Sequence, residues 1–302
     1  MPIRIAASIY LCFVVILAAG STLPGGAFWV SFGALVGTCV GSFLNVVAYR
    51  LPLMMQRDWV RESREVLELP VEPAGVPFNL ALPRSRCSSC GHQITWYENI
   101  PVLSYLILKG RCSSCASPIG VRYPLVEMFA GLITAVVFAM YGGTVQSAII
   151  SGFVLVSLAI ALIDADTFLI PDILSQPLLW AGLLLSVLGH GPAVATAVVG
   201  AAVGYGSLWA VNGAYKLLRG QDGMGAGDFK YLAACGAFLG AKPLAVVIVF
   251  AAGAAVLLTF GLALFNRKGV KGTTALPFGP YLAAGAVATM LLKAYIPSHL
   301  LT

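Results

Sequence analysis

The chain has 302 residues, of which 59% are hydrophobic and 10% are charged, and its mean hydropathy is +0.90. These values exclude an ordinary soluble domain, in which roughly 25% of residues are charged. The formal charge is +6, but the basic residues are not gathered on one soluble face, so we expect no nucleic-acid partner. The composition predicts a protein that lies in a lipid bilayer.

The N-terminal region, residues 1–49, holds two apolar segments. Residues 27–49 are long enough to cross a hydrocarbon core of about 30 Å as a helix. Residues 3–20 form a further apolar run, but no small-residue cleavage site precedes Pro24. A ninth span, an interfacial helix and an uncleaved signal-like start therefore all remain open for this run.

The long polar region, residues 50–123, is predicted to form a small cytoplasmic loop domain. Its first part has mixed charges at helical spacing, which favours a surface helix. Prolines within residues 70–83 then interrupt the pattern, so we expect a linker there.

Two matching cysteine motifs, Cys87-Ser-Ser-Cys90 and Cys112-Ser-Ser-Cys115, follow in the same region. In a reducing cytoplasm, two such turns favour a tetrahedral metal site over disulfides, because each presents a pair of thiolates. Four protein ligands leave no position for water, so the motifs predict a structural zinc ion. His92 is expected to be a surface residue and not a ligand.

The remaining region, residues 124–302, is predicted to be a transmembrane core. Together with residues 27–49, its apolar segments make about eight transmembrane helices, and the segment at 229–241 is short. The predicted segments are 124–141, 146–163, 173–190, 192–215, 229–241, 243–265 and 277–296. The predicted fold class is therefore an all-α polytopic membrane protein with a zinc-binding cytoplasmic loop domain.

The distribution of basic residues predicts the orientation of these helices. If residues 50–123 face the cytoplasm and the spans alternate, 15 of the 18 Lys and Arg residues lie on the inner side or at its boundary. Only Lys242 and Lys293 fall outside, and Arg4 is undetermined. This asymmetry is typical of proteins of a cytoplasmic membrane.

Carboxylates in or beside the spans are candidates for function, because an ionisable group in hydrocarbon is costly. Asp164 stands at the inner end of a predicted span, and Asp166 follows two residues later. Two residues correspond to about 200° of rotation on a helix, so these side chains should not share a face. Asp172 precedes the next apolar run and is expected to be a helix N-cap.

A second acidic site is the segment GMGAGDF, in which Gly225 and Gly227 lead to Asp228. Glycines allow close approach of the backbone to a neighbouring helix or a substrate strand, although a glycine-rich turn that ends in an N-cap aspartate is an alternative. In the predicted orientation, Asp164 and Asp228 both emerge at the cytoplasmic face and can meet. Two aspartates that share a proton are the chemistry of aspartic proteolysis.

The segments GSFLNVVAYRLP, the doubled cysteine motif, LIDADTFLIPD, GMGAGDFK and PFGPYLAAG occur in this order along nearly the whole chain. In this arrangement the chain resembles the type IV prepilin peptidases. The resemblance implies a bifunctional leader peptidase and N-methyltransferase of the GxGD aspartic protease group. By this resemblance, Asp164 and Asp228 match the two catalytic aspartates, whereas Asp166 and Asp172 do not.

The resemblance also implies partners and a second cofactor. Its substrates are type IV prepilins and pseudopilins of type II secretion, cut on the cytoplasmic side of the bacterial inner membrane, where membrane lipids surround the enzyme. The new N-terminus is then methylated from S-adenosylmethionine. No GxGxxG pattern between a strand and a helix is present to bind a nucleoside, so methylation depends on the resemblance.

Several residues are weaker candidates for supporting roles. Asn99, Lys109 and Gly110 lie between the cysteine motifs and could serve methylation, with an ordinary loop role as the alternative. Glu127 could meet a substrate amine or a lysine, or be solvated at headgroup level. Lys230 could act on a nearby carboxylate or extend towards anionic lipid.

Two other classes of protein compete with the peptidase. A proton-coupled transporter could use the same aspartates as a relay, but both lie at span ends on one side and no inverted repeat is evident. A membrane-tethered zinc module that binds a partner or nucleic acid would leave the aspartates unexplained.

Overall fold

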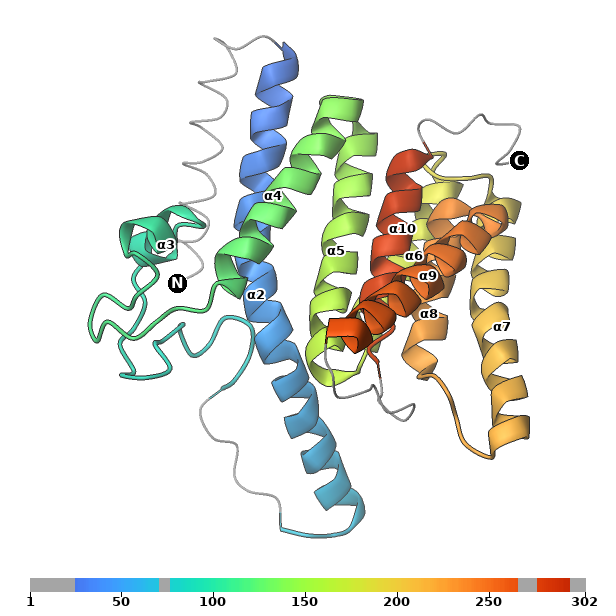
Figure 1. Cartoon of the computed structure of the whole chain (residues 1–302), viewed down its shortest axis with the longest axis horizontal. Helices are drawn as coiled ribbons and strands as arrows, with labels where there is room; N and C mark the ends of the chain where they lie inside the picture. Colours follow the sequence, from blue (N-terminus) through green and yellow to red (C-terminus); the bar gives the residue numbers. More distant parts are fainter. Residues whose placement is uncertain (1–24, 71–76, 266–275, 294–302) are drawn as a thin grey trace. The chain divides into compact units, whose positions relative to one another are not determined.

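The structure, a computed structural model, describes residues 25–70, 77–265 and 276–293. Within these ranges it consists of helices and loops with two isolated β-bridges, which confirms the all-α prediction (Figure 1). Each of the eight predicted apolar segments coincides with a helix. The predicted segment at 3–20 lies outside the described residues.

Five of the described helices are long and apolar enough to cross a membrane. The other three helices of the core are shorter, and α8 and α10 have 14 residues each. A helix of that length extends about 21 Å, less than a hydrocarbon core of about 30 Å. The five are α2 (Gly25–Val66), α4 (Arg122–Tyr141), α5 (Val145–Thr167), α7 (Val194–Arg219) and α9 (Ala241–Phe265), and the three are α6 (Asp172–Val187), α8 (Ala226–Leu239) and α10 (Gly279–Leu292).

Helix α2 is longer than the sequence predicts. The first span and the charged surface helix that follows it form one continuous helix of 42 residues, with Pro52 inside it. Such a helix is about 63 Å long, twice the thickness of the hydrocarbon core, so its charged end extends beyond the bilayer.

The described chain divides into two compact units. The first contains the residues up to Leu155 except 55–58, and the second contains residues 55–58 and the residues from Val156. In the first unit, α2 packs closely against α4 through Gly33, Gly37 and Gly41. A Cβ atom at Gly37 would lie 1.8 Å from Thr134 Oγ1, and the Thr134 hydroxyl donates a hydrogen bond to the Gly33 carbonyl at 2.7 Å. Small residues at this spacing bring helices together in membranes, because lipid offers no hydrophobic driving force.

In the second unit, α8 lies in the interior and packs against α6, α7, α9 and α10. Residues 231–240 are all buried. Gly200 of α7 and Gly236 of α8 face each other so closely that a Cβ atom on either would come within 2.3 Å of the other's carbonyl oxygen. Because α8 lies inside the second unit, it can position Asp228 although it is too short to cross the bilayer.

Candidate active site and metal centre

Asp164 lies in the last turn of α5, and only 5% of its surface is exposed. Its Oδ2 accepts a hydrogen bond of 2.8 Å from the backbone N–H of Gly279, the first residue of α10. A Cβ atom at position 279 would lie 2.8–3.0 Å from three atoms of the Asp164 side chain. Glycine at this position therefore allows the α10 backbone to bind the carboxylate directly.

Asp228 lies in the first turn of α8, and its backbone N–H donates to the carbonyl of Gly225 at 3.2 Å. Gly225 is the N-cap residue and has extended backbone angles, so the alternative that Asp228 is the N-cap is wrong. A Cβ atom at Gly227 would lie 2.8 Å from that of Ile170, so the glycine brings α8 close to the segment between α5 and α6. Oδ1 of Asp228 is buried and has no hydrogen-bond partner among the described residues.

The two aspartates, 64 positions apart in sequence, lie close enough for their charges to interact. Asp166 is exposed whereas Asp164 is buried, as the predicted rotation between them requires. One carboxylate is held by an amide, and the other presents an unpaired oxygen. A pair of this kind can activate a water molecule and polarise a carbonyl.

Asp172 and Lys230 form an ion pair between the first turns of α6 and α8. Lys230 Nζ donates to Asp172 Oδ1 at 2.8 Å and to Oδ2 at 2.7 Å. The N-cap residue of α6 is Pro171, and Asp172 makes no capping hydrogen bond, so the predicted N-cap role of Asp172 is wrong. Lys230 follows Asp228 by two residues, and the pair therefore ties the start of α8 to α6.

The four cysteines of the doubled motif converge, as predicted. Their Sγ atoms all lie within 4.8 Å of one another, and Sγ of Cys87 and Sγ of Cys115 are 3.8 Å apart. A tetrahedral zinc ion with Zn–S bonds of about 2.3 Å requires S···S separations of about 3.8 Å, so the geometry fits the ion.

The two cysteine turns have the same backbone hydrogen bonds. In the first, Cys87 N–H donates to His92 and Gly91 N–H donates to Cys87; in the second, Cys112 N–H donates to Ser117 and Ala116 N–H donates to Cys112. Each turn thus closes within six residues and presents its thiols independently of the rest of the fold. We call the two turns, 86–93 and 111–118, the knuckles.

Glu98 links the knuckles. It accepts hydrogen bonds from the hydroxyl of Ser113 and from the N–H and hydroxyl of Thr95, and its oxygens lie 3.3 Å from Nε2 of His92. These hydrogen bonds, of which the one from Ser113 has the largest effect, lower the pKa of Glu98 to about 2. His92 is therefore part of this network and lies outside the group of four thiols. That it is not a metal ligand stays a prediction.

The remaining candidates differ in their surroundings. Glu127 is buried and accepts a hydrogen bond of 2.7 Å from the backbone N–H of Val102, so it is not the solvated glutamate of the sequence-based alternative. Gly110 has a φ of +68°, and Lys109 precedes it with a φ of +52°, so both belong to a turn. Asn99 ends the short 3-10 helix η1 (Tyr97–Asn99) and is exposed.

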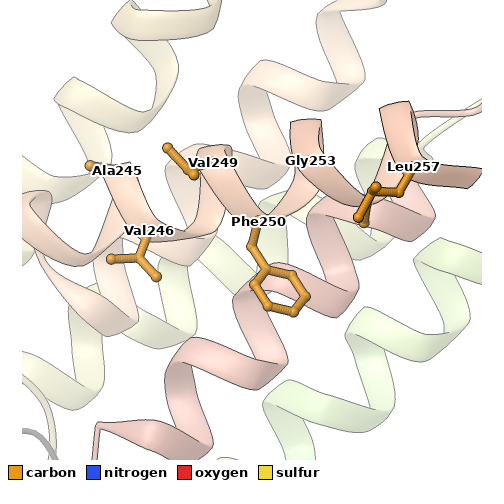
Figure 2. Close-up of a pocket in the computed structure, with 7 residues that line it drawn as sticks. Ala245, Val246, Val249, Phe250, Gly253 and Leu257 are labelled. Carbon is orange, nitrogen blue, oxygen red and sulfur yellow. The ribbon is translucent and has the colours of Figure 1, made fainter.

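A hollow of about 510 Å³ runs along one face of α9 (Figure 2). Its lining includes Val246, Val249, Phe250 and Leu257, and none of its lining residues is titratable. It therefore does not coincide with either site described above. An apolar helix face of this composition is what contact with lipid chains requires.

Comparison with known families divides the chain in two. Residues 35–141 match the bacterial peptidase A24 N-terminal domain, and residues 151–264 match the type IV leader peptidase family. The chain belongs to the type IV leader peptidase family. It is therefore a peptidase by family, and the family resemblance stated from the sequence motifs is confirmed.

Curated relatives cover most of the chain. A prepilin leader peptidase/N-methyltransferase of Burkholderia pseudomallei is 45% identical over 278 residues, which are 91% of this chain and 88% of the relative. Proteins of the same name from Pseudomonas putida and Pseudomonas aeruginosa are each 46% identical, over 87% and 85% of this chain and 91% and 88% of theirs. No solved structure matches the chain. None of these matches supports the transporter alternative.

The leader peptidase match contains Asp164 and Asp228, and the N-terminal match contains all four knuckle cysteines. The role of Gly279, whose N–H binds Asp164, was not predicted from the sequence. The only signal was the motif PFGPYLAAG, in which Gly279 lies between Phe278 and Pro280. The ion pair of Asp172 with Lys230 was not predicted either, because it depends on how α6 packs on α8.

Proposed function

We propose that this chain cuts the leader peptide from type IV prepilins with Asp164 and Asp228 and methylates the new N-terminus. The single observation that carries the catalytic assignment is the meeting of a buried Asp164 and a half-buried Asp228 from separate helices. Carboxylates in a membrane protein are retained at such a position for function, since burial penalises their charge.

The cleavage step follows from the pair. One carboxylate, in its ionised form, takes a proton from water as the water oxygen attacks the scissile carbonyl carbon. The other, in its protonated form, donates a hydrogen bond to the developing oxyanion and supplies the proton that the leaving amine needs. Repulsion between two nearby carboxylates supplies this mixed protonation state. The Gly279 N–H keeps the Asp164 carboxylate in position, and Gly227 allows α8 to approach.

The knuckles are proposed to hold one structural zinc ion through Cys87, Cys90, Cys112 and Cys115. The thiol spacing supports this assignment, and four ligands saturate the ion. When bound, zinc supplies folding free energy to the loop and no catalytic water. Glu98 then joins the two turns through His92 and Ser113.

Methylation is proposed from the names of the relatives, and S-adenosylmethionine would be the methyl donor. The chemistry that this group supplies is transfer of a methyl group from a sulfonium to the free amine of the new N-terminus. Asn99, Lys109 and Gly110 remain candidates for this reaction. Gly110 is buried and in a turn, so it would shape the loop, whereas exposed Asn99 and Lys109 can reach a ligand.

We further propose that the enzyme lies in the bacterial inner membrane with the knuckles and both aspartates on the cytoplasmic side. The distribution of Lys and Arg supports this orientation. Pseudopilins of type II secretion are proposed as additional substrates, and membrane lipids as the surroundings of the apolar helix faces. Reporter fusions within residues 50–123 and near Gly142 test the orientation, which is wrong if the first reporter is accessible from outside.

One experiment tests both activities. The membrane-embedded protein is incubated with a prepilin-like peptide and labelled S-adenosylmethionine, and the products are analysed by mass spectrometry. We expect a cut at the leader junction and the label on the new N-terminus. An intact peptide would contradict the peptidase, and a cut, unlabelled product would contradict only the methyltransferase.

A further inference from the structure

The segment between the two knuckles exposes large apolar side chains. Trp96, Tyr97, Leu103, Leu106 and Ile107 have exposed fractions of 70%, 56%, 51%, 65% and 69%. We call these five residues the inter-knuckle surface. Side chains of this size are usually buried, so five exposed ones between residues 96 and 107 mark a segment that binds something apolar.

The inter-knuckle surface is attached to the start of a membrane helix. The Val102 N–H, directly before α3 (Leu103–Ile107), donates to Glu127 Oε2 at 2.7 Å. Glu127 lies five residues after Arg122, where α4 begins, which corresponds to about 7.5 Å along the helix. The surface is therefore held near the level at which α4 enters the bilayer, where the headgroups lie.

The attachment point is a strained turn. Val102 has φ +60° and ψ −49°, and the N–H of Leu103 donates to the carbonyl of Pro101, which makes a γ-turn. A β-branched residue rarely adopts a positive φ. Such a conformation persists only where surrounding contacts enforce it, and the buried Glu127 carboxylate supplies such a contact.

The charges around this surface favour an anionic layer. Between Asn99 and Arg111 the sequence has no acidic residue, while Lys109 and Arg111 are exposed. Glu98, the nearest carboxylate before this segment, has a side chain that is only 7% exposed and is engaged by Thr95 and Ser113. Tryptophan and tyrosine are enriched at headgroup level, and lysine and arginine near the surface attract anionic lipids.

From these contacts we propose that the inter-knuckle surface inserts into the headgroup region of the membrane and anchors the zinc-binding loop to the lipid. A lipid surface is favoured over a protein partner because the Glu127 hydrogen bond positions the segment at the membrane boundary, and because the aromatic, aliphatic and basic groups match that layer. The anchor would hold the loop beside the membrane, where a membrane-bound substrate emerges.

The test uses the full-length protein in vesicles of phosphatidylcholine and phosphatidylglycerol. The difference in fluorescence between the unaltered protein and Trp96→Phe isolates the contribution of Trp96. We expect lipids with brominated acyl chains to quench most of this contribution and aqueous acrylamide to quench little of it. Quenching by acrylamide without quenching by brominated lipid would overturn the proposal. Protection from acrylamide that appears only with a prepilin-like peptide would overturn it too, because the surface would then bind substrate.

Two variants make the test specific. Leu106→Glu/Ile107→Glu adds charge to the surface, and we expect it to lose most of the brominated-lipid quenching of Trp96. Ala81→Glu adds a charge at an exposed residue outside the surface and outside both knuckles, and should retain the quenching. Retention of zinc in both variants shows that the loop is folded. If the double variant loses zinc, the single variants Leu106→Ser and Ile107→Ser replace it. Unchanged quenching by brominated lipid in a surface variant that retains zinc would contradict the proposed membrane anchor.

Discussion

The knuckles and the aspartate pair are built in opposite ways. Each knuckle closes its hydrogen bonds within six residues, so its geometry is local. The aspartate site joins α5, α8 and α10, and its closest contact links residues 115 positions apart. A local site survives changes elsewhere in the fold, whereas a site between helices depends on every close approach that brings those helices together. Four experiments test this difference, in order of decreasing expected effect.

The largest effect is expected from removing either aspartate. Asp164→Asn and Asp228→Asn should each lower leader cleavage by about 10²–10⁴-fold, because an amide can neither take nor give the proton that the reaction moves. Cleavage of a prepilin-like peptide by membranes with matched protein levels, scored by mass, measures this. Asp166→Asn is the control, because this side chain is exposed whereas that of Asp164 is buried. Full activity in either of the first two variants would refute the assignment.

A methyl group at Gly279 should have the next largest effect. Gly279→Ala places a Cβ atom 2.8 Å from Asp164 Oδ2, so the carboxylate or α10 must shift. A displacement of about 1 Å in a catalytic group can cost about 10²-fold in rate, and we expect a loss of that order in kcat. Gly253→Ala in α9 is the matched control, because a Cβ atom there meets nothing within 4 Å. Equal activity of the two variants would contradict the close contact.

Loss of the metal site should separate the two activities. Replacing all four knuckle cysteines by serine should remove zinc and abolish methylation, while most of the leader cleavage remains, because the aspartates belong to a different unit of the chain. Metal analysis and the peptide assay with labelled S-adenosylmethionine measure the two effects. A parallel loss of cleavage and methylation, at unchanged protein abundance, would argue against independent sites.

The smallest effect is expected from the ion pair beside the aspartates. Lys230 and Asp172 are partly exposed, and pairs of this kind contribute about 0–1 kcal/mol. Lys230→Ala and Asp172→Asn should therefore retain cleavage within about fivefold of the unaltered protein. The exchange Asp172→Lys/Lys230→Asp should recover part of the loss if the pair positions α8. An inactive Asp172→Asn variant would give Asp172 a larger role than the structure supports.

Local patterns in the sequence predicted much of this protein. Apolar runs located all eight helices of the described core, because a helix in a bilayer needs apolar side chains and forms the hydrogen bonds of its backbone within itself. The CxxC spacing predicted which four thiols converge, because a short turn determines where its thiols point. The separation of Asp164 from Asp166 followed from helical rotation alone.

Other features depended on contacts between distant segments. The continuity of α2 through Pro52, the ion pair of Asp172 with Lys230 and the burial of Glu127 all differ from the sequence-based expectation or were absent from it. None of these features has a local sequence pattern. An aspartate at the start of a helix, for example, can be an N-cap or an ion-pair partner, and the sequence alone does not distinguish the two roles.

The sequence by itself determined that the chain lies in a membrane, which residues could react, and which could bind zinc, because composition and spacing act over a few residues. Only the tertiary structure decided that Gly279 binds Asp164 and that α8 lies inside the second unit. The physical reason is that helix packing in a membrane depends on where small residues allow backbones to touch. Which of the many glycines forms such a contact depends on the partner helix, so the sequence of a single helix does not determine it.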